Sequence, residues 1–265
     1  MTPPSSGADR RDANPSPTED PAEKMDRMYR WTRHVYDLTR RYYLLGRDRL
    51  LDRITDQEDG RVLEVGCGTG RNLRVLAETA PHHELYGVDA SRAMLATART
   101  ALDRAGLTGR VTLAQGLAER LDPRVHFGMN DPLDIVFFSY VLSMISEWRL
   151  ALARSLSHLA DNGRLYVVDF WDQDDLPAWV APTLQNWLSL FDVRPRPHLL
   201  RTLRMLDDRG WLSCTIQSVG GRYAYLAIVE PVPERVDVAV DALLRPDRDL
   251  PVDAPIDAAP NPRPG

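Results

Sequence analysis

The residues best suited to chemistry are one acid and three glycines that lie close together in the sequence. Glu64 sits near the end of an apolar run, and Gly66, Gly68 and Gly70 follow at every second position. The apolar run predicts a buried strand, and the pattern after the last glycine predicts a helix. Glycines between a strand and a helix let bare backbone N–H groups approach a ligand. We therefore expect a ligand-binding loop, and the Glu64 carboxylate favours a cationic or hydroxyl-bearing ligand over a pyrophosphate.

Several kinds of loop compete for this spacing. A dinucleotide fingerprint reads G-x-G-x-x-G, whereas this chain reads G-x-G-x-G. A phosphate-binding P-loop needs G-K-[ST], and the only lysine is Lys24, far upstream. An unliganded glycine turn is disfavoured, because three alternating glycines are costly to order without a use for the space. The E-x-G-x-G-x-G spacing instead resembles the first motif of the class I S-adenosylmethionine-dependent methyltransferases.

A second acid, Asp89, ends the next predicted strand, about 20 residues past the glycine loop. An acid in this place can accept hydrogen bonds from both ribose hydroxyls of a nucleoside. In the methyltransferase family an acid often follows the third strand and binds the adenine amine, but Leu117 stands there in this chain. We expect backbone groups of Leu117 and Ala118, helped by Gln115, to replace it. The expected S-adenosylmethionine-binding residues are Glu64, Gly66, Cys67, Gly68, Gly70, Asn72, Asp89, Ala90, Met94, Gln115, Gly116 and Leu117.

Polar and aromatic residues also follow the predicted fourth and fifth strands, at 133–138 and 164–169. In open α/β sheets, ligands bind outside the carboxyl ends of the strands. Tyr140 and Ser143 are therefore candidates for the acceptor side, with helix capping or core packing as the competing interpretation. Asp169 and Trp171 lie at the end of the fifth strand.

Residues 25–54 read as helix and carry eight arginines against four aspartates, in a chain whose net charge is −5. Tyr29, Tyr36 and Tyr43 are seven residues apart, so they fall on one side of a helix. One interpretation is an amphipathic helix that covers the sheet. The other is a lid over the donor pocket that also rests on an anionic membrane surface.

The composition predicts one large α/β domain, because 265 residues with 43% hydrophobic content can bury a substantial core. The negative net charge argues against a general nucleic-acid binder. Two cysteines form no disulfide framework, and no metal-ligand spacing is present. No secretory signal or membrane-spanning run is visible. The expected organisation is a disordered tail (1–24), a helical lid (25–57), a methyltransferase domain (58–231) with a helical insertion (172–210), and a largely disordered extension (232–265) with a short helix at 236–244.

The family resemblance implies a Rossmann-like sheet that is mostly parallel with an antiparallel last strand, and helices on both faces. A narrower resemblance rests on M-D-R-M-Y-R at 25–30, Y-D-L-T-R-R-Y-Y-L-L-G-R-D-R-L at 36–50, G-C-G-T-G-R-N at 66–72 and S-Y-V-L-S-M-I at 139–145. Together these are similar to the bacterial diacylglycerylhomoserine N-methyltransferases. The resemblance implies three methylations of one lipid amine to form a betaine lipid, by a cytoplasmic protein at the inner face of the membrane.

Such an amine must first lose a proton, for which His34 and Asp169 are the candidate bases. Aromatic faces can then hold the trimethylated cation, and an arginine can pair with the homoserine carboxylate. The predicted catalytic residues are Tyr140, Tyr36, His34 and Asp169, and the predicted substrate-binding residues are Tyr29, Arg33, Tyr43, Ser143 and Trp171. A different acceptor, such as a quinone ring, a phospholipid amine or a small soluble amine, and a non-catalytic S-adenosylmethionine binder are the alternatives.

Overall fold

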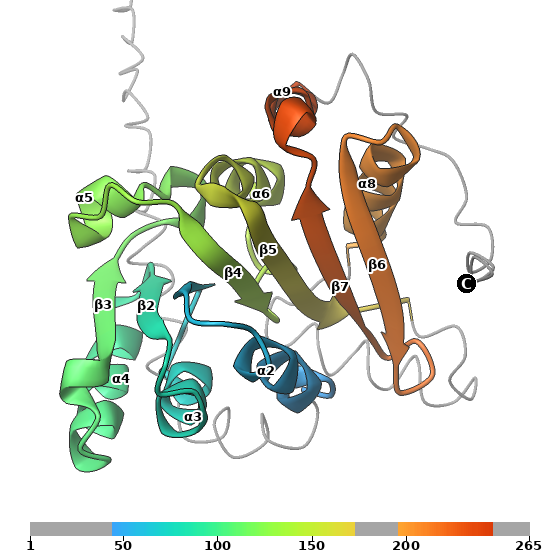
Figure 1. Cartoon of the computed structure of the whole chain (residues 1–265). Coiled ribbons are helices and arrows are strands. Elements are labelled where there is room, and N and C mark those ends of the chain that lie inside the picture. Colours follow the sequence, from blue (N-terminus) through green and yellow to red (C-terminus); the bar gives the residue numbers. More distant parts are fainter. Residues whose placement is uncertain (1–43, 173–195, 246–265) are drawn as a thin grey trace, which may run out of the picture.

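A computed structural model describes residues 44–172 and 196–245, which form a sheet covered by helices on both faces (Figure 1). The strand order in the described residues is β3-β2-β1-β4-β5-β7-β6. β7 runs antiparallel to both of its neighbours, and the other pairings are parallel. The strands are β1 (Arg61–Val65), β2 (Glu84–Asp89), β3 (Val111–Gln115), β4 (Leu133–Ser139), β5 (Leu159–Phe170), β6 (Leu212–Val219) and β7 (Ala224–Pro231). The predicted mostly parallel α/β sheet with an antiparallel last strand is confirmed.

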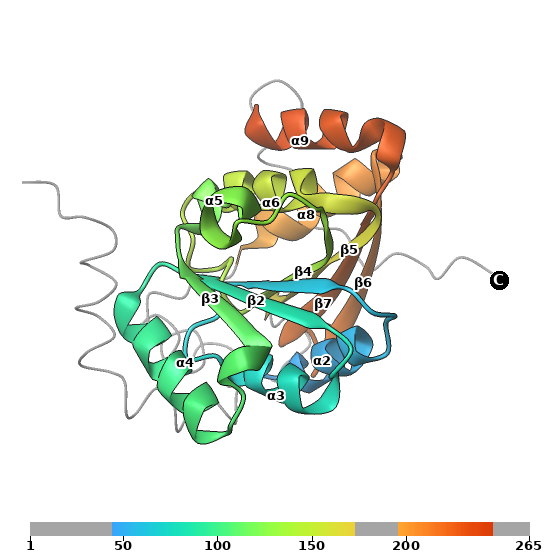
Figure 2. The same ribbon diagram turned by 60° about the vertical axis from the view of Figure 1, so that its left-hand side comes forward.

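The helices form one layer on each side of the sheet (Figure 2). One layer holds α2 (Arg47–Thr55), α3 (Arg71–Thr79) and α4 (Arg92–Arg104). The other holds α5 (Pro123–Phe127), α6 (Trp148–Ser157), α8 (Pro197–Asp208) and α9 (Val236–Leu244). Three short 3-10 turns complete the described elements: η1 (Thr108–Arg110), η2 (Ala118–Arg120) and η3 (Pro233–Arg235).

Each central strand is buried on both faces, because successive side chains point to opposite helix layers. On β4, Val136 and Phe138 join the core under α6, whereas Ile135 and Phe137 join the core over α2 and α3. Burying one such side chain contributes about 1.5–3 kcal/mol. This two-sided burial explains why the strands read as short apolar runs.

The start of β5 differs from the sequence expectation. The sequence predicts a helix at 148–159 and a turn at Asn162-Gly163 before the strand at 164–169. Instead, α6 ends at Ser157 and β5 already pairs with β4 at Leu159. The register then shifts, so that Arg164 lies opposite Ile135. Gly163 allows this bulge, because a Cβ on it would lie 3.0–3.1 Å from backbone atoms of Ala160 and Asp134.

The predicted short helix after β7 is present as α9 and buries Ala239, Ala242 and Leu243 in the core that α6 shares. The packed domain therefore continues past residue 231. Residues 1–43, 173–195 and 246–265 lie outside the described residues, and with them most of the predicted lid. In the described ranges, no helix has both the length and the apolar character needed to cross a membrane.

Candidate active site

The glycine loop lies between β1 and α3, at the carboxyl edge of the parallel strands. Gly66, Gly68 and Gly70 have φ values of 75°, 54° and 73°, which L side chains rarely adopt. The backbone N–H groups of Gly66 and Cys67 both donate to the Val88 carbonyl, at 2.8 and 3.1 Å. This bonding anchors the loop to β2, the neighbouring strand.

Gly66 also joins the glycine loop to the loop that follows β4. A Cβ on Gly66 would lie 2.4 Å from Val141 Cγ2, so only a bare Cα fits there. Gly70 is similarly close to α4, with a Cβ position 3.0 Å from Ala98 Cβ. The predicted donor side and acceptor side are therefore in direct contact.

Asp89 fixes the geometry of the second predicted motif. Its Oδ2 accepts a hydrogen bond from Gly68 N at 2.7 Å, and its Oδ1 accepts one from Ser91 N at 2.8 Å. Ser91 in turn caps α4, since its hydroxyl accepts from Met94 N at 3.3 Å. A carboxylate oxygen can accept more than one hydrogen bond. Asp89 can therefore hold the loop in place and still accept ribose hydroxyls.

Glu64 is buried, with 2% of its surface exposed, and accepts a hydrogen bond from Asn72 Nδ2 at 2.7 Å. Arg71 donates to Asn72 Oδ1 at 3.3 Å and forms an ion pair with Asp48 of α2, also at 3.3 Å. Two predicted cofactor residues, Glu64 and Asn72, are thus in contact. The buried carboxylate places negative charge beside the glycine loop, where a ligand's amine would fit.

The ends of β2 and β3 are tied together by Gln115. Its Nε2 donates to the Ala90 carbonyl at 3.1 Å, and its Oε1 accepts from Arg92 Nε at 2.8 Å. Gly116 N donates to the Asp89 carbonyl at 3.0 Å, and Leu117 follows half-buried. The Gln115 side chain therefore braces the pocket wall.

Cys67 and Met94, two of the predicted cofactor-binding residues, have buried side chains. The Cys67 side chain packs in the core beneath α3, where burial raises the pKa of its thiol and the nearby Asp89 and Glu64 carboxylates add to that rise. Met94 is buried on α4. Cys67 thus supplies backbone to the loop while its side chain faces the core.

Tyr140 opens the loop after β4 with a positive φ of 57°. Its hydroxyl donates to the Leu45 carbonyl at 2.5 Å, and its ring meets Phe170 edge-on at 4.7 Å between centroids. Burial raises the pKa of the Tyr140 phenol well above its usual value. Tyr140 therefore connects the segment before α2 to the acceptor-side loop.

Asp169 holds the same loop from β5. Its Oδ2 accepts from Ser143 N at 2.9 Å, and its Oδ1 accepts from Phe170 N at 2.8 Å. Burial raises the pKa of the Asp169 carboxyl to about 6, against the opposing effect of these hydrogen bonds and of the nearby Arg196 guanidinium. Arg196 also donates from Nε to the Leu142 carbonyl at 3.0 Å. Two charged side chains thus fix residues 142 and 143.

Trp171, a predicted substrate-binding residue, is the first residue after β5. It is buried, packs edge-on against Tyr225 at 6.1 Å, and lies 5.2 Å from the Arg222 guanidinium. Its backbone N–H donates to the Tyr223 carbonyl at 3.0 Å. This aromatic and cationic surrounding lies next to Asp169.

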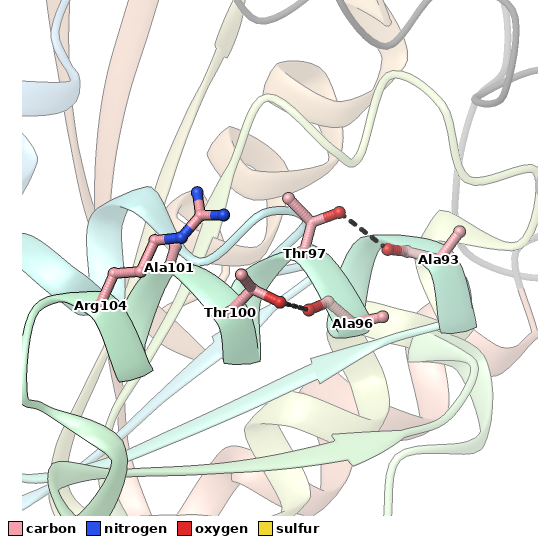
Figure 3. Close-up of a pocket in the computed structure, with 6 residues that line it drawn as sticks. All are labelled: Ala93, Ala96, Thr97, Thr100, Ala101 and Arg104. Atoms are coloured by element: carbon pink, nitrogen blue, oxygen red, sulfur yellow. Dashed lines mark hydrogen bonds between the residues drawn. The ribbon is translucent and has the colours of Figure 1, made fainter.

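Two hollows lie away from these residues. One, of about 400 Å³, runs along α4, and the hydroxyls of Thr97 and Thr100 that line it donate to carbonyls of the same helix at 3.0 and 2.9 Å (Figure 3). The other, of about 370 Å³, is lined by residues 122–124 and 129–132 with Ser157 and His158, just before β4 and β5 begin. Neither contains a predicted site residue.

The structure brings together the predicted cofactor residues of β1, β2 and β3, and it places Tyr140, Ser143, Asp169 and Trp171 beyond β4 and β5. Sequence reasoning missed Ser91, Val141 and Arg196. Ser91 could have been found, because a serine two residues after Asp89 and just before a helix is a typical N-cap. The remaining predicted residues, His34, Tyr36, Tyr29, Arg33 and Tyr43, lie outside the described residues.

Residues 63–165 match a family described as a methyltransferase domain. A demethylmenaquinone methyltransferase of Thermus thermophilus is 30% identical over 140 residues, covering 51% of this chain and 60% of that protein. A ubiquinone/menaquinone biosynthesis C-methyltransferase of Pseudomonas paraeruginosa is 29% identical over 219 residues, covering 77% and 83%. The solved structure of an S-adenosylmethionine-dependent methyltransferase from Aquifex aeolicus covers 78% of this chain and 95% of its own, with a TM-score of 0.50 and 18% identity.

Over residues 63–165 this chain is therefore similar to a methyltransferase domain family. The Thermus relative is spanned over 60% of its length, and the solved structure supports the fold alone. The Aquifex protein is described as dependent on S-adenosylmethionine, and the residues at the carboxyl edge of the sheet in this chain fit that cofactor. Glu64 would supply a carboxylate for its amine and Asp89 would supply acceptors for its ribose, while Gly66 and Gly68 have no side chain to obstruct the loop between them.

Proposed function

We propose that this protein transfers methyl groups from S-adenosylmethionine to the head-group amine of diacylglycerylhomoserine. Three successive transfers give a betaine lipid, and the protein works on the cytoplasmic face of the membrane. The observation that carries the proposal is Asp169, a buried carboxylate on β5 that fixes the loop in contact with the glycine loop. The motifs similar to the diacylglycerylhomoserine N-methyltransferases support the choice of acceptor.

S-adenosylmethionine, when bound, supplies a methyl group already activated by its sulfonium. The protein's contribution is then mainly positioning. Asp89 would accept hydrogen bonds from the ribose, and the buried Glu64 carboxylate would pair with the amine of the ligand. The contact of Gly66 with Val141 keeps the acceptor-side loop against the glycine loop.

The acceptor amine is mostly protonated near neutral pH, because primary amines of this kind have pKa values of about 8–10. We assign the removal of this proton to Asp169. Burial raises the pKa of this carboxyl to about 6, which is close to the value that a general base needs near neutral pH. Each Asp169 oxygen accepts one backbone N–H and keeps a lone pair for the incoming proton.

The product of the third transfer is a fixed cation, which aromatic faces can hold without donating a hydrogen bond. Phe170 lies between Tyr140 and Tyr223, at 4.7 and 5.8 Å between ring centroids, and Trp171 follows it. These rings support an amine acceptor. Tyr140 supports the site through its bond to Leu45, so its proposed role is to place the loop and the rings.

A second candidate function is methylation of a quinone-type ring. The observation that favours it is the Pseudomonas relative, a ubiquinone/menaquinone biosynthesis C-methyltransferase that matches 77% of this chain. A ring acceptor would use the same donor site and the same aromatic surroundings. The two acceptors differ in whether an amine has to be deprotonated.

The test is mass spectrometry of products after incubating the full-length protein with S-adenosylmethionine and vesicles. One set of vesicles contains diacylglycerylhomoserine and another contains demethylmenaquinone. Gains of one, two and three methyl groups on the lipid are expected, and Asp169→Asn should abolish them while S-adenosylhomocysteine still binds. Methyl groups gained by the quinone alone would show that the acceptor is the quinone ring and not the lipid amine. Cofactor binding without any gain would indicate a non-transferring binder.

A further inference from the structure

The end of β3 is where the base of a bound nucleoside must lie. Asp89 at the end of β2 takes the ribose, and Glu64 on β1 takes the amino-acid part. The base therefore extends to the other side of Asp89, toward β3. Asp89 pairs with Gln115 there, and Gly116 N donates to the Asp89 carbonyl at 3.0 Å.

The side chains of β3 itself leave the amino group of adenine without an acceptor. Leu117 is apolar, and both ends of the Gln115 amide are engaged, by Ala90 and by Arg92. A side chain that accepts a hydrogen bond from this amino group, beside the expected backbone groups of Leu117 and Ala118, has to come from another element.

His126 of α5 reaches this place. A Cβ on Gly116 would lie 2.2 Å from His126 Nε2 and 2.7 Å from its Cδ2, so the imidazole edge lies directly against the Gly116 backbone. The position is set by the start of α5, where Asp122 caps the helix by accepting from Arg124 N at 2.9 Å. His126 is half-buried.

The hydrogen bonding of His126 determines which ring nitrogen can accept. Nδ1 lies 2.7 Å from the Asp122 carbonyl oxygen, which can only accept, so Nδ1 carries the proton. Asp122 N also approaches Nδ1, at 3.3 Å, but this longer contact is the weaker of the two. In the neutral ring Nε2 is then an acceptor, and residues 44–172 and 196–245 provide no hydrogen-bond partner for it.

We propose that His126 Nε2 accepts a hydrogen bond from the exocyclic amino group of adenine and so determines the base specificity of the donor site. The inference rests on the proposed function, because it needs a nucleoside bound at Asp89. It predicts that an inosine base binds poorly, since its O6 would place a second acceptor against Nε2.

The experiment is calorimetric titration of the full-length protein with S-adenosylhomocysteine and with its inosine counterpart. The wild type should bind the adenine ligand about 10-fold more tightly. His126→Leu should lose most of this preference by weakening the adenine ligand, and His126→Gln should restore part of it, because its carbonyl oxygen can accept. Val125→Ala is the matched control, since its side chain is 78% exposed on the same helix.

Equal losses for both ligands in His126→Leu, or no loss for either, would overturn the assignment. Thermal melting of each variant identifies a folding defect. If His126→Leu is unfolded, the ligand preference of His126→Gln, whose side chain is of similar size, decides whether His126 reads the adenine amino group. A wild type that binds neither ligand would count against the proposed function instead.

Discussion

Replacing Gly66 by alanine tests the contact on which the arrangement of the site depends. Two separate costs act on this substitution. The φ of 75° is unfavourable for an L residue, by about 1–2 kcal/mol. The new methyl would also lie 2.4 Å from Val141 Cγ2, and overpacking of this kind costs about 1–3 kcal/mol. We therefore expect Gly66→Ala to lower the free energy of unfolding by about 2–5 kcal/mol.

Gly106→Ala isolates the first cost. Gly106 has a similar φ of 69°, but nothing lies within 4 Å of its Cβ position. This variant should lose only about 1–2 kcal/mol. Adding Val141→Ala to Gly66→Ala should recover the steric part, which appears as a coupling energy of about 1–3 kcal/mol in the double-mutant cycle.

The assay is urea unfolding at equilibrium, with S-adenosylhomocysteine titrated into each folded variant. Gly66→Ala should also weaken the ligand, because the loop must move away from Val141, whereas Gly106→Ala should bind normally. Equal stability losses in Gly66→Ala and Gly106→Ala, with no coupling to Val141→Ala, would refute the argument that the two loops are locked together at this point.

Other expected outcomes concern single polar groups. Asp89→Asn should raise the dissociation constant for S-adenosylhomocysteine about 10- to 100-fold, because an amide cannot accept from Gly68 N and Ser91 N together; titration calorimetry checks this, and unchanged binding contradicts it. The Asp169 pKa is raised from 3.8 to about 6, so the folded protein binds this proton more tightly than the unfolded chain. Relative to Asp169→Asn, the wild type should therefore lose about 3 kcal/mol as the pH rises from about 4 to 6; a pH-independent difference in urea unfolding would refute it. Tyr140→Phe removes the bond to Leu45 and should cost about 1 kcal/mol, measured as a change in melting temperature. Tyr86→Phe should cost less, because the Tyr86 hydroxyl donates to Glu84 at the surface.

Much of the fold could be read from the sequence because its signals are local. Short apolar runs separated by helical patterns predict parallel strands with crossover helices, and the glycine spacing of the loop requires a special backbone. The prediction for the start of β5 was wrong because Asn162-Gly163 usually marks a turn. Here the pairing of Leu159 with Leu133 extends the strand and turns that dipeptide into a bulge.

The donor site was predictable for a related reason. Glu64, Gly66 and Asp89 lie at fixed places relative to their own strands, and parallel strands bring their carboxyl ends to one edge. The sequence by itself therefore determined the fold class and the edge of the sheet at which the expected cofactor-binding residues meet.

Only the tertiary structure decided the partners of these side chains. Tyr140 and Leu45 are 95 positions apart, Ser143 and Asp169 are 26 apart, and Arg196 meets Leu142 across 54 positions. Such contacts leave no periodic pattern in the sequence, because they arise when separate elements converge on the same edge. His126 is the clearest case: its own helix fixes the tautomer, but its place beside Gly116 depends on how α5 packs against the end of β3.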